Sequence, residues 1–246
     1  MIRPTEVWSC GGGTQSGAIA TLIRLGKLPK PDYAFMTDTE RERSSTWPFV
    51  DGFIRPALES VGLKLQVIKA VDYGASLDVV YISEKGEQTP LLPMYTTLAG
   101  SGKLSPFCSG KWKRDVGERW MRSIGIETAR NWIGISRDEA RRIRAQHRNW
   151  LELWYPLIFE VPMTRDMCVS LIREQGWTGQ IPHSACYMCP NHSDAEWIDM
   201  KLHWSADFQE DPHLYLHPSC VPLAEVDFFA QRSMLEERGC YAGCFT

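Results

Sequence analysis

The sequence predicts an α/β protein in which a parallel, twisted sheet is flanked by helices. Three short apolar segments, residues 6–10, 31–36 and 64–68, alternate along the chain with segments of helical apolar spacing. A run of three glycines follows the first apolar segment directly. Strands that alternate with helices form parallel sheets through right-handed crossovers. The 246 residues suffice for one large domain, or for one domain with a small appendage.

The first elements follow from apolar spacing and from the positions of glycine and proline. Glycines stop the first strand, and the second predicted helix is interrupted near Pro48 and Pro56, because proline removes a helical hydrogen bond. In order, the predicted elements are a strand at 6–10, a helix at 16–25, a strand at 31–36, a helix at 46–60 and a strand at 64–68.

The remainder of the chain begins with a long loop at residues 84–110, rich in glycine and proline. Long loops in compact domains are usually functional or mobile. The later predicted elements are helices at 111–124, 138–148, 164–175, 195–202 and 223–235, a strand at 130–135, a cysteine-bearing loop at 182–190 and a mobile tail at 239–246.

Composition excludes several classes of protein. With 43% apolar and 23% charged residues the chain is neither disordered nor a coiled coil. No run of about 18 apolar residues occurs, so no transmembrane helix or membrane partner is expected. The net charge of −3 excludes a globally basic nucleic-acid binder. We read no secretory signal, so a reducing, cytoplasmic location is expected, where eight cysteines indicate metal, iron–sulfur or redox chemistry.

The glycine run lies where a strand ends and a helix begins, an arrangement that binds phosphate. Glycine lets backbone amides approach an oxyanion, and a helix N-terminus adds about half a positive charge. A tight turn that needs glycine for steric reasons is the alternative. The segment Gly100-Ser101-Gly102-Lys103-Leu104 is not a Walker A motif, because leucine follows the lysine where serine or threonine is required. The segment 11–16 is not a dinucleotide-binding motif, because it lacks the third glycine.

The segment Ser9-Cys10-Gly11-Gly12-Gly13-Thr14-Gln15-Ser16 resembles the pyrophosphatase loop (PP-loop) of the adenine-nucleotide alpha-hydrolase superfamily. More narrowly, it is similar to the phosphoadenosine phosphosulfate (PAPS) reductase family. The loop departs from the common form at Gln15, which stands at or near an aspartate position, and Glu40 stands where glycine is usual. The other matching segments are 38–42, 107–113, 132–142, 155–157 with 163–165, and 184–190.

The resemblance implies a Rossmann-like fold that binds ATP or another adenine nucleotide across the C-terminal ends of the strands. Asp38 would face the nucleotide or Mg²⁺, with capping of the following turn as its alternative role. Gly134 would lie against the ribose or adenine, and Arg137, Arg141 and Arg142 would reach phosphate or sulfate oxygens. The implied phosphate-binding residues are Ser9, Gly11, Gly12, Gly13, Thr14, Gln15 and Ser16.

We expect residues 1–160 to form the nucleotide-binding α/β domain. Residues 161–246 would form a helical, cysteine-rich part that packs on this domain and ends in the mobile tail.

The pair Cys186-x-x-Cys189 is typical of half of a metal or iron–sulfur site. By the resemblance, Cys108 supplies a third thiolate, so that three cysteines hold a 4Fe-4S cluster and leave one iron open. Cys168, Cys240 or Cys244 is a candidate fourth ligand. Zn²⁺ is the alternative metal, since His183 and His192 flank the pair at the spacing His-x-x-Cys-x-x-Cys-x-x-His.

The tail pair Cys240-x-x-x-Cys244 has a different interpretation. The resemblance implies a tail cysteine as nucleophile, and two such cysteines can carry a persulfide and then form a disulfide. A metal-ligand pair or two unremarkable thiols is the alternative. Cys10 and Cys168 are expected to be buried.

A basic surface is predicted on the helix at 138–148. Its arginines at 137, 141, 144 and 148 share one helical face, which indicates either nucleic-acid contact or a solvated face that reaches the nucleotide.

The predicted function is therefore enzymatic sulfur transfer, in which an oxygen of the substrate is adenylated and then displaced by sulfur. The candidate substrates include a nucleic-acid base or backbone. The first alternative is a thiol-dependent reductase that releases sulfite from PAPS or adenylyl sulfate. The second is a non-catalytic, zinc-stabilised module that binds nucleotide or nucleic acid. Expected partners are an adenine nucleotide, a nucleic acid, a sulfur or electron donor protein and a second copy of the chain.

Overall fold

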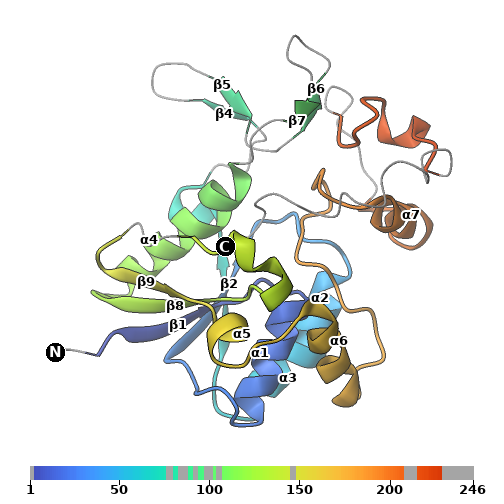
Figure 1. Cartoon of the computed structure of the whole chain (residues 1–246). Helices are drawn as coiled ribbons and strands as arrows, with labels where there is room; N and C mark the ends of the chain where they lie inside the picture. The colour runs from blue at the N-terminus through green and yellow to red at the C-terminus, as the bar shows by residue number, and fades with distance from the viewer. Residues whose placement is uncertain are drawn as a thin grey trace.

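The computed structural model describes residues 3–75, 80–82, 88–90, 94–96, 102–103, 107–144, 148–207 and 215–228 (Figure 1). Its main sheet has five strands in the order β3-β2-β1-β8-β9, and every neighbouring pair is parallel. The strands are β1 Thr5–Ser9, β2 Tyr33–Asp38, β3 Leu65–Lys69, β8 Ala129–Ile133 and β9 Leu151–Trp154. The predicted parallel sheet is confirmed; the edge strand β9 was not predicted.

Helices cover both faces of this sheet, so alternate residues of each central strand enter different cores. Val7 packs with residues of α4, whereas its neighbour Trp8 packs with residues of α1, and both side chains are fully buried. Strands buried on both faces are apolar throughout, which explains why β1 was recognisable. In Figure 1, α4 lies above the sheet, and helices α1, α3 and α6 lie below it. The covering helices are α4 Asp115–Ser123 on one face, and α1 Thr14–Arg24, α3 Arg55–Glu59 and α6 Arg165–Glu174 on the other.

The helix predicted at 46–60 is present but irregular. It runs through α2 Thr46–Phe49, a π-helical turn Val50–Ile54 and α3. The π-helical turn lies between Pro48 and Pro56, where proline interrupts regular hydrogen bonding. A similar π-helical turn, Gly110–Arg114, precedes α4.

The prediction of a helix at 138–148 is wrong. Among the described residues of this segment, 138–144 and 148, the chain forms only a short 3-10 helix, Arg137–Arg142, and Ile143 then has an extended ψ of 130°. Side-chain bonds from Gln15, Ser136 and Arg142 to the Glu139 carboxylate stabilise this turn locally. The four arginines therefore do not share one helical face. The prediction that a helix begins at residue 223 is also wrong, because Leu223–Glu225 forms a 3-10 turn and Val226 is extended.

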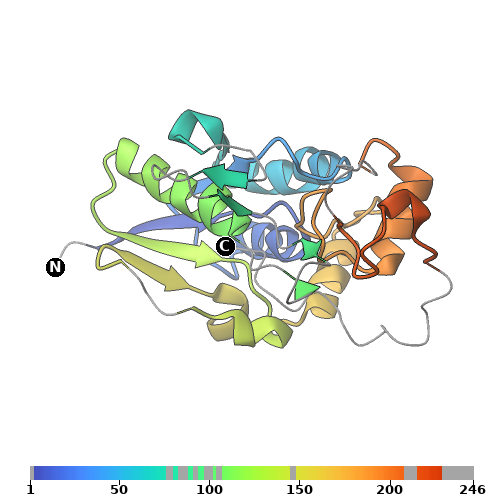
Figure 2. The ribbon, with the colours of Figure 1, turned by 90° about the horizontal axis from the view of Figure 1, so that it is seen from above.

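The region after α5 Pro156–Phe159 divides between two cores. Helix α6 packs on α1, with Cys168 and Ile172 in the main core. Helix α7 Asp194–His203 belongs to a separate cluster around Trp197 and Met200. Figure 2 shows α7 beyond the ends toward which the strand arrows point. A domain boundary near residue 160 stays a prediction.

Two small antiparallel hairpins lie in and just before the region 84–110 that was predicted as a long loop. The pairs are β4 Val80–Ile82 with β5 Gln88–Pro90, and β6 Tyr95–Thr96 with β7 Gly102–Lys103. Across the described part of the chain, none of the helices has the length and apolar character that crossing a bilayer requires.

Candidate functional site

The glycine loop joins the C-terminal end of β1 to the N-terminus of α1, as predicted. Gly12 has a φ of +74°, and a Cβ at this position would lie 2.8 Å from Met36 Cε. The backbone angle therefore favours glycine, whereas the contact is with the flexible end of the Met36 side chain. Gly13 is the N-cap residue of α1 and makes no side-chain capping bond. The first turn of α1 is thus left without a side-chain cap.

The amides of the loop fall into two groups. Gly11 N–H donates to Ser16 Oγ at 2.9 Å, and Thr14 N–H donates to the Pro182 carbonyl at 3.1 Å. Among the described residues, the amides of Gly13, Gln15 and Ser16 have no acceptor. Because these amides point from a helix N-terminus, they favour an anion there. Only part of the 11–16 segment is therefore available for a phosphate.

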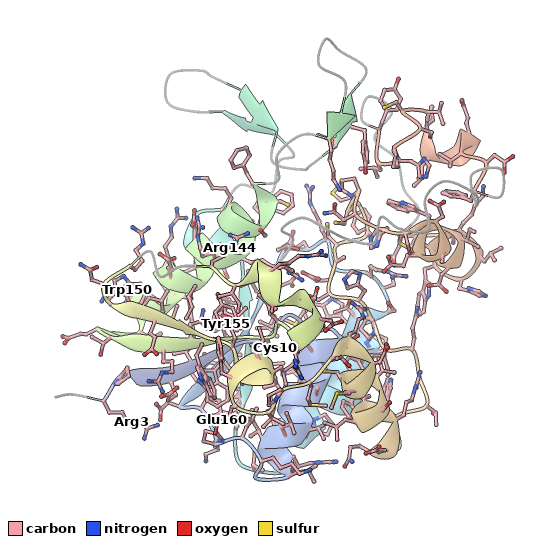
Figure 3. All side chains as sticks on the ribbon, viewed as in Figure 1. Arg3, Cys10, Arg144, Trp150, Tyr155 and Glu160 are labelled. Atoms are coloured by element: carbon pink, nitrogen blue, oxygen red, sulfur yellow. The ribbon has the colours of Figure 1, made fainter. Side chains whose placement is uncertain are left out.

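A cleft adjoins the loop at the C-terminal edge of the sheet, where ligands bind in open α/β sheets. Its larger part is a cavity of about 160 Å³ between the ends of β1 and β2 and helix α4. Cys10 and Arg144, both labelled in Figure 3, line this part. The smaller part lies over the start of α1 and shares Ser9 and Gly11 with the cavity.

The cleft brings together most, but not all, of the predicted phosphate-binding residues. Those that line it are Ser9, Gly11, Gly13, Gln15, Ser16 and Gly134. Gly12, Thr14, Asp38, Arg137 and Arg141 do not line it. Glu139 and Arg142 do line it, and Glu139 was not singled out from the sequence although it belongs to a matching motif.

Gln15, which departs from the family pattern, is bound to Glu139. Its Nε2 donates to Glu139 Oε2 at 2.7 Å, and Arg142 pairs with the other oxygen of the same carboxylate. An aspartate at position 15 lacks this donor and would repel Glu139. Arg142 lines the same part of the cleft as the unpaired amides, and its guanidinium is paired there with Glu139.

Asp38 caps the turn after β2, which is the alternative role considered for it. Its Oδ1 accepts from Glu40 N–H at 2.7 Å, and Glu40 has a left-handed φ of +57°. Glycine is favoured at such a φ, so the usual glycine of the motif has a conformational reason here. Contact between Asp38 and Mg²⁺ stays a prediction.

Two other matching motifs meet through a buried ion pair. Lys113 Nζ lies 3.1 Å from Glu42 Oε1, and the Glu42 side chain is fully buried. Lys113 also lines the larger cavity. Residues 71 positions apart in the sequence are thus joined beneath the cleft.

The cysteine-bearing loop at 182–190 is bonded directly to the glycine loop. Thr14 donates to the Pro182 carbonyl from both its amide and its hydroxyl, and Ser184 Oγ donates to the Gly11 carbonyl. Cys186 follows two residues later and forms a β-bridge with Glu42. The cysteine pair therefore lies beside the glycine loop and the turn after β2.

Cys108 approaches the same region from the helical segment before α4. Arg41 lies over the Trp112 ring at 5.0 Å and contacts Met188 Sδ at 3.0 Å, and Tyr187 N–H donates to the Arg41 carbonyl. Arg41 thus joins the segment of Cys108 to the loop of the cysteine pair. Cys108 and Cys189 are buried and Cys186 is half-buried.

The three sulfurs do not form a ready site for a single ion. Ligand atoms of one tetrahedral Zn²⁺ bound by thiolates lie about 3.8 Å apart, whereas the Sγ atoms of Cys108, Cys186 and Cys189 are not all within 4.8 Å of one another. A 4Fe-4S cluster binds each thiolate to a different iron, so it needs wider spacing. Half-buried and buried thiols on adjoining segments fit the donor chemistry of such a cluster.

No protein-family model matches the chain, and no curated protein matches it. Among solved structures the chain is similar to the U34-tRNA thiolase NcsA from Methanococcus maripaludis with its 4Fe-4S cluster, at a TM-score of 0.45 and 15% sequence identity. The match covers 84% of this chain and 68% of that chain.

The predicted zinc set is not the set that meets in the structure. His183 and His192 come together with Glu196, not with Cys186 and Cys189. Burial alone would raise the pKa of Glu196, but the two imidazole rings outweigh it and hold this pKa well below its ordinary value. Glu196 lies four residues after His192, and this spacing is the sequence signal that could have singled it out.

Cys168 and Cys10 are buried, as predicted, and Cys168 packs in the main core away from the other candidate ligands. Burial raises the pKa of Cys10 to about 11. Burial, and then Asp138, raise the pKa of Cys168 to about 12. The nucleophilic tail proposed at Cys240 and Cys244 lies outside the described residues.

We expect N-ethylmaleimide to leave Cys10 and Cys168 unmodified in the native protein at pH 7 to 8. The thiolate is the reactive form, and a raised pKa suppresses it until the pH approaches that pKa. Peptide mass mapping after timed labelling measures this, with partly exposed Cys220 as the control. Labelling of Cys10 as fast as Cys220 would contradict the burial described here.

Proposed function

We propose that this chain is an ATP-dependent sulfurtransferase, which adenylates an oxygen of its substrate and replaces that oxygen with sulfur. The observation that carries the proposal is the direct bonding between the glycine loop and the loop of the cysteine pair. A site for an anionic nucleotide and a group of thiols thereby share one edge of the sheet. The order of the family-like motifs along the chain supports the same activity.

The nucleotide would bind across the cleft. Its phosphates would meet the unpaired amides of Gly13, Gln15 and Ser16, together with the Arg142 guanidinium. Its nucleoside would fill the adjoining cavity of about 160 Å³. Gly134, which lines the smaller part of the cleft, would lie against the ribose or adenine. Mg²⁺, bound with the nucleotide and facing Asp38, would offset phosphate charge.

Two displacements follow from this geometry. First, a substrate oxygen attacks the α-phosphorus, the bond to pyrophosphate breaks, and the substrate proton passes to solvent. The α1 amides and Arg142 stabilise the charge that develops on the phosphates. Second, hydrosulfide from a sulfur donor forms a carbon–sulfur bond and gives its proton to solvent, while the carbon–oxygen bond breaks and AMP leaves with the oxygen.

The thiols have a separate part in this proposal. Cys108, Cys186 and Cys189 would hold a 4Fe-4S cluster, which supplies a Lewis-acid position for the incoming sulfur. A nucleic-acid base is the substrate class that we propose, since Arg144 lines the cavity and Arg148 is about half exposed nearby.

The activity is tested by incubating the anaerobically purified protein with ATP, Mg²⁺, a sulfide source and unmodified tRNA. Pyrophosphate release that depends on the nucleic acid, with thiolated nucleoside found by mass spectrometry, is the expected result. Thioredoxin-dependent release of sulfite from PAPS, without pyrophosphate release, would establish the reductase instead. Tight nucleotide binding without either turnover would overturn both enzymatic assignments.

Replacing Cys186 with serine is expected to remove most of the iron and the visible absorbance of the cluster. One of three thiolates is lost, and a serine oxygen is a poor ligand for iron of this kind. Iron analysis and an anaerobic visible spectrum measure the effect.

Cys220→Ser is the matched control for this variant, because Cys220 is partly exposed and belongs to neither loop of the site. It should keep the iron content of the unaltered protein. Equal iron in both variants would remove Cys186 from the ligand set and leave the nucleotide site untouched.

A further inference from the structure

We propose that His183, His192 and Glu196 bind a zinc ion at the edge of the nucleotide cleft. Glu196 Oε1 lies 3.0 Å from His183 Nδ1 and 3.7 Å from His192 Nδ1. The three ligand atoms all lie within 4.8 Å of one another. This site is independent of the proposed sulfur transfer and uses none of the cysteine sulfurs.

The orientation of His192 gives the main support. Its side chain is fully buried, and its Nε2 lies 2.9 Å from the Cys186 carbonyl, which only accepts, so Nε2 carries the proton. In the neutral ring, Nδ1 then presents a lone pair toward the Glu196 carboxylate. Nδ1 has no hydrogen-bond partner among the described residues. Two acceptors that face each other in a buried place are unfavourable unless a proton or a metal cation lies between them, and zinc is the cation that we propose.

Such an arrangement is the usual one for a metal-binding histidine. The ring nitrogen that does not bind the metal donates to a backbone carbonyl or a carboxylate, which sets the tautomer and the ring orientation. The Cys186 carbonyl has this role for His192.

The spacing of the ligand atoms also fits zinc. Zn²⁺ binds imidazole nitrogen and carboxylate oxygen at about 2.1 Å, so tetrahedral ligands stand about 3.4 Å apart. The observed separations of 3.0 and 3.7 Å lie on either side of this value. Small side-chain rotations therefore suffice to enclose an ion.

Glu196 is held in place by its other oxygen. Oε2 accepts from Ser193 N–H at 2.9 Å and from Ser193 Oγ at 3.1 Å, within the capping box that begins α7. Oε1 is consequently directed to the two histidines.

The surrounding charge is compatible with a dication. Arg43 lies 3.9 Å from Glu196 Oε1, but its guanidinium is paired with Asp199 at 3.0 Å. The carboxylates of Glu196 and Asp199 and the guanidinium of Arg43 together carry a net charge of about −1 before the metal binds. Three protein ligands leave a fourth zinc position for water or another oxygen, and His183 itself lines the cleft.

The proposal is tested first by zinc content. The full chain, dialysed against a weak chelator, should retain about one zinc per chain by plasma mass spectrometry. His192→Gln and Glu196→Gln should each lower zinc affinity by at least about tenfold. His203→Gln is the matched control, because His203 is an exposed histidine of α7, paired with Asp199. It should keep its zinc.

Retention of zinc in both site variants, or its absence from the unaltered protein, would overturn the proposal. Cys186→Ser distinguishes this site from the thiols, since it should lose iron and keep zinc. Loss of zinc in that variant would assign the metal to the cysteines instead.

Cobalt substitution provides a test that does not depend on the variants folding. Co²⁺ added to the chelator-treated, unaltered protein should give visible d–d bands of a four-coordinate nitrogen and oxygen site, without a thiolate charge-transfer band. A strong thiolate band would overturn the assignment. Because neither measurement uses ATP, failure of the sulfur-transfer proposal would not affect the result.

Discussion

Replacing Gly13 with alanine is expected to weaken ATP binding by at least about 100-fold, which is about 2.7 kcal/mol. The added Cβ would lie 2.6 Å from the Ser184 amide nitrogen and 3.1 Å from the Pro182 carbonyl oxygen. Because both are backbone atoms, the 182–184 segment must move away from α1. The two hydrogen bonds from Thr14 to Pro182 would then be lost, and the unpaired amides would no longer face the cleft correctly.

Backbone strain makes no contribution to this effect, since Gly13 has a φ of −109°, which alanine adopts freely. Isothermal titration with ATP and Mg²⁺ measures the affinity. Gly62→Ala is the control: its φ of +68° strains the backbone, but no atom lies within 4 Å of the added Cβ and it does not line the cleft. Gly62→Ala should lose some stability and keep its affinity. Unchanged affinity in Gly13→Ala would place the nucleotide elsewhere.

Trp132→Ala is expected to lower the free energy of unfolding by about 4 kcal/mol. Trp132 lies in β8 within the main core, is fully buried, and packs edge-on against Trp154 with ring centroids 4.7 Å apart. Its Nε1–H donates to Glu6 Oε2 at 2.7 Å. The substitution therefore leaves a large cavity and also removes a partner of a buried carboxylate.

Urea unfolding followed by circular dichroism measures this change. Trp132→Phe should cost less, since most of the ring volume remains and only the bond to Glu6 is lost. Phe159→Ala, at a side chain 63% exposed, should change stability by no more than about 0.5 kcal/mol. A loss of 1 kcal/mol or less in Trp132→Ala would contradict the packing described for β8.

Local patterns predicted some structural features well and others poorly. The turn between β1 and α1 was recognisable, because an apolar segment, three glycines and helical spacing follow one another directly. The helix at 138–148 was not predictable, because Glu139 binds Gln15, 124 positions away, and stabilises a short turn instead. Strand β9 was missed since it is a four-residue edge strand with exposed Glu152.

The candidate site shows the same division. The residue types for binding phosphate and a cluster were readable in Ser9–Ser16, Cys186 and Cys189, because these chemistries need particular side chains at short spacing. Which amides remain unpaired was not readable, since Ser16 and Pro182 occupy two of them. Arg142 and Glu139 enter the cleft while Arg137 and Arg141 do not.

The sequence by itself determined the alternation of strands and helices, the position of the glycine turn and the presence of paired cysteines, because each depends on neighbours within a few residues. Only the tertiary structure decided which distant groups meet. Ser184 bonds to Gly11, Glu42 pairs with Lys113, and Glu196 joins His183 and His192. Such contacts depend on how helices and loops pack at the sheet edge, and no local periodicity encodes that packing.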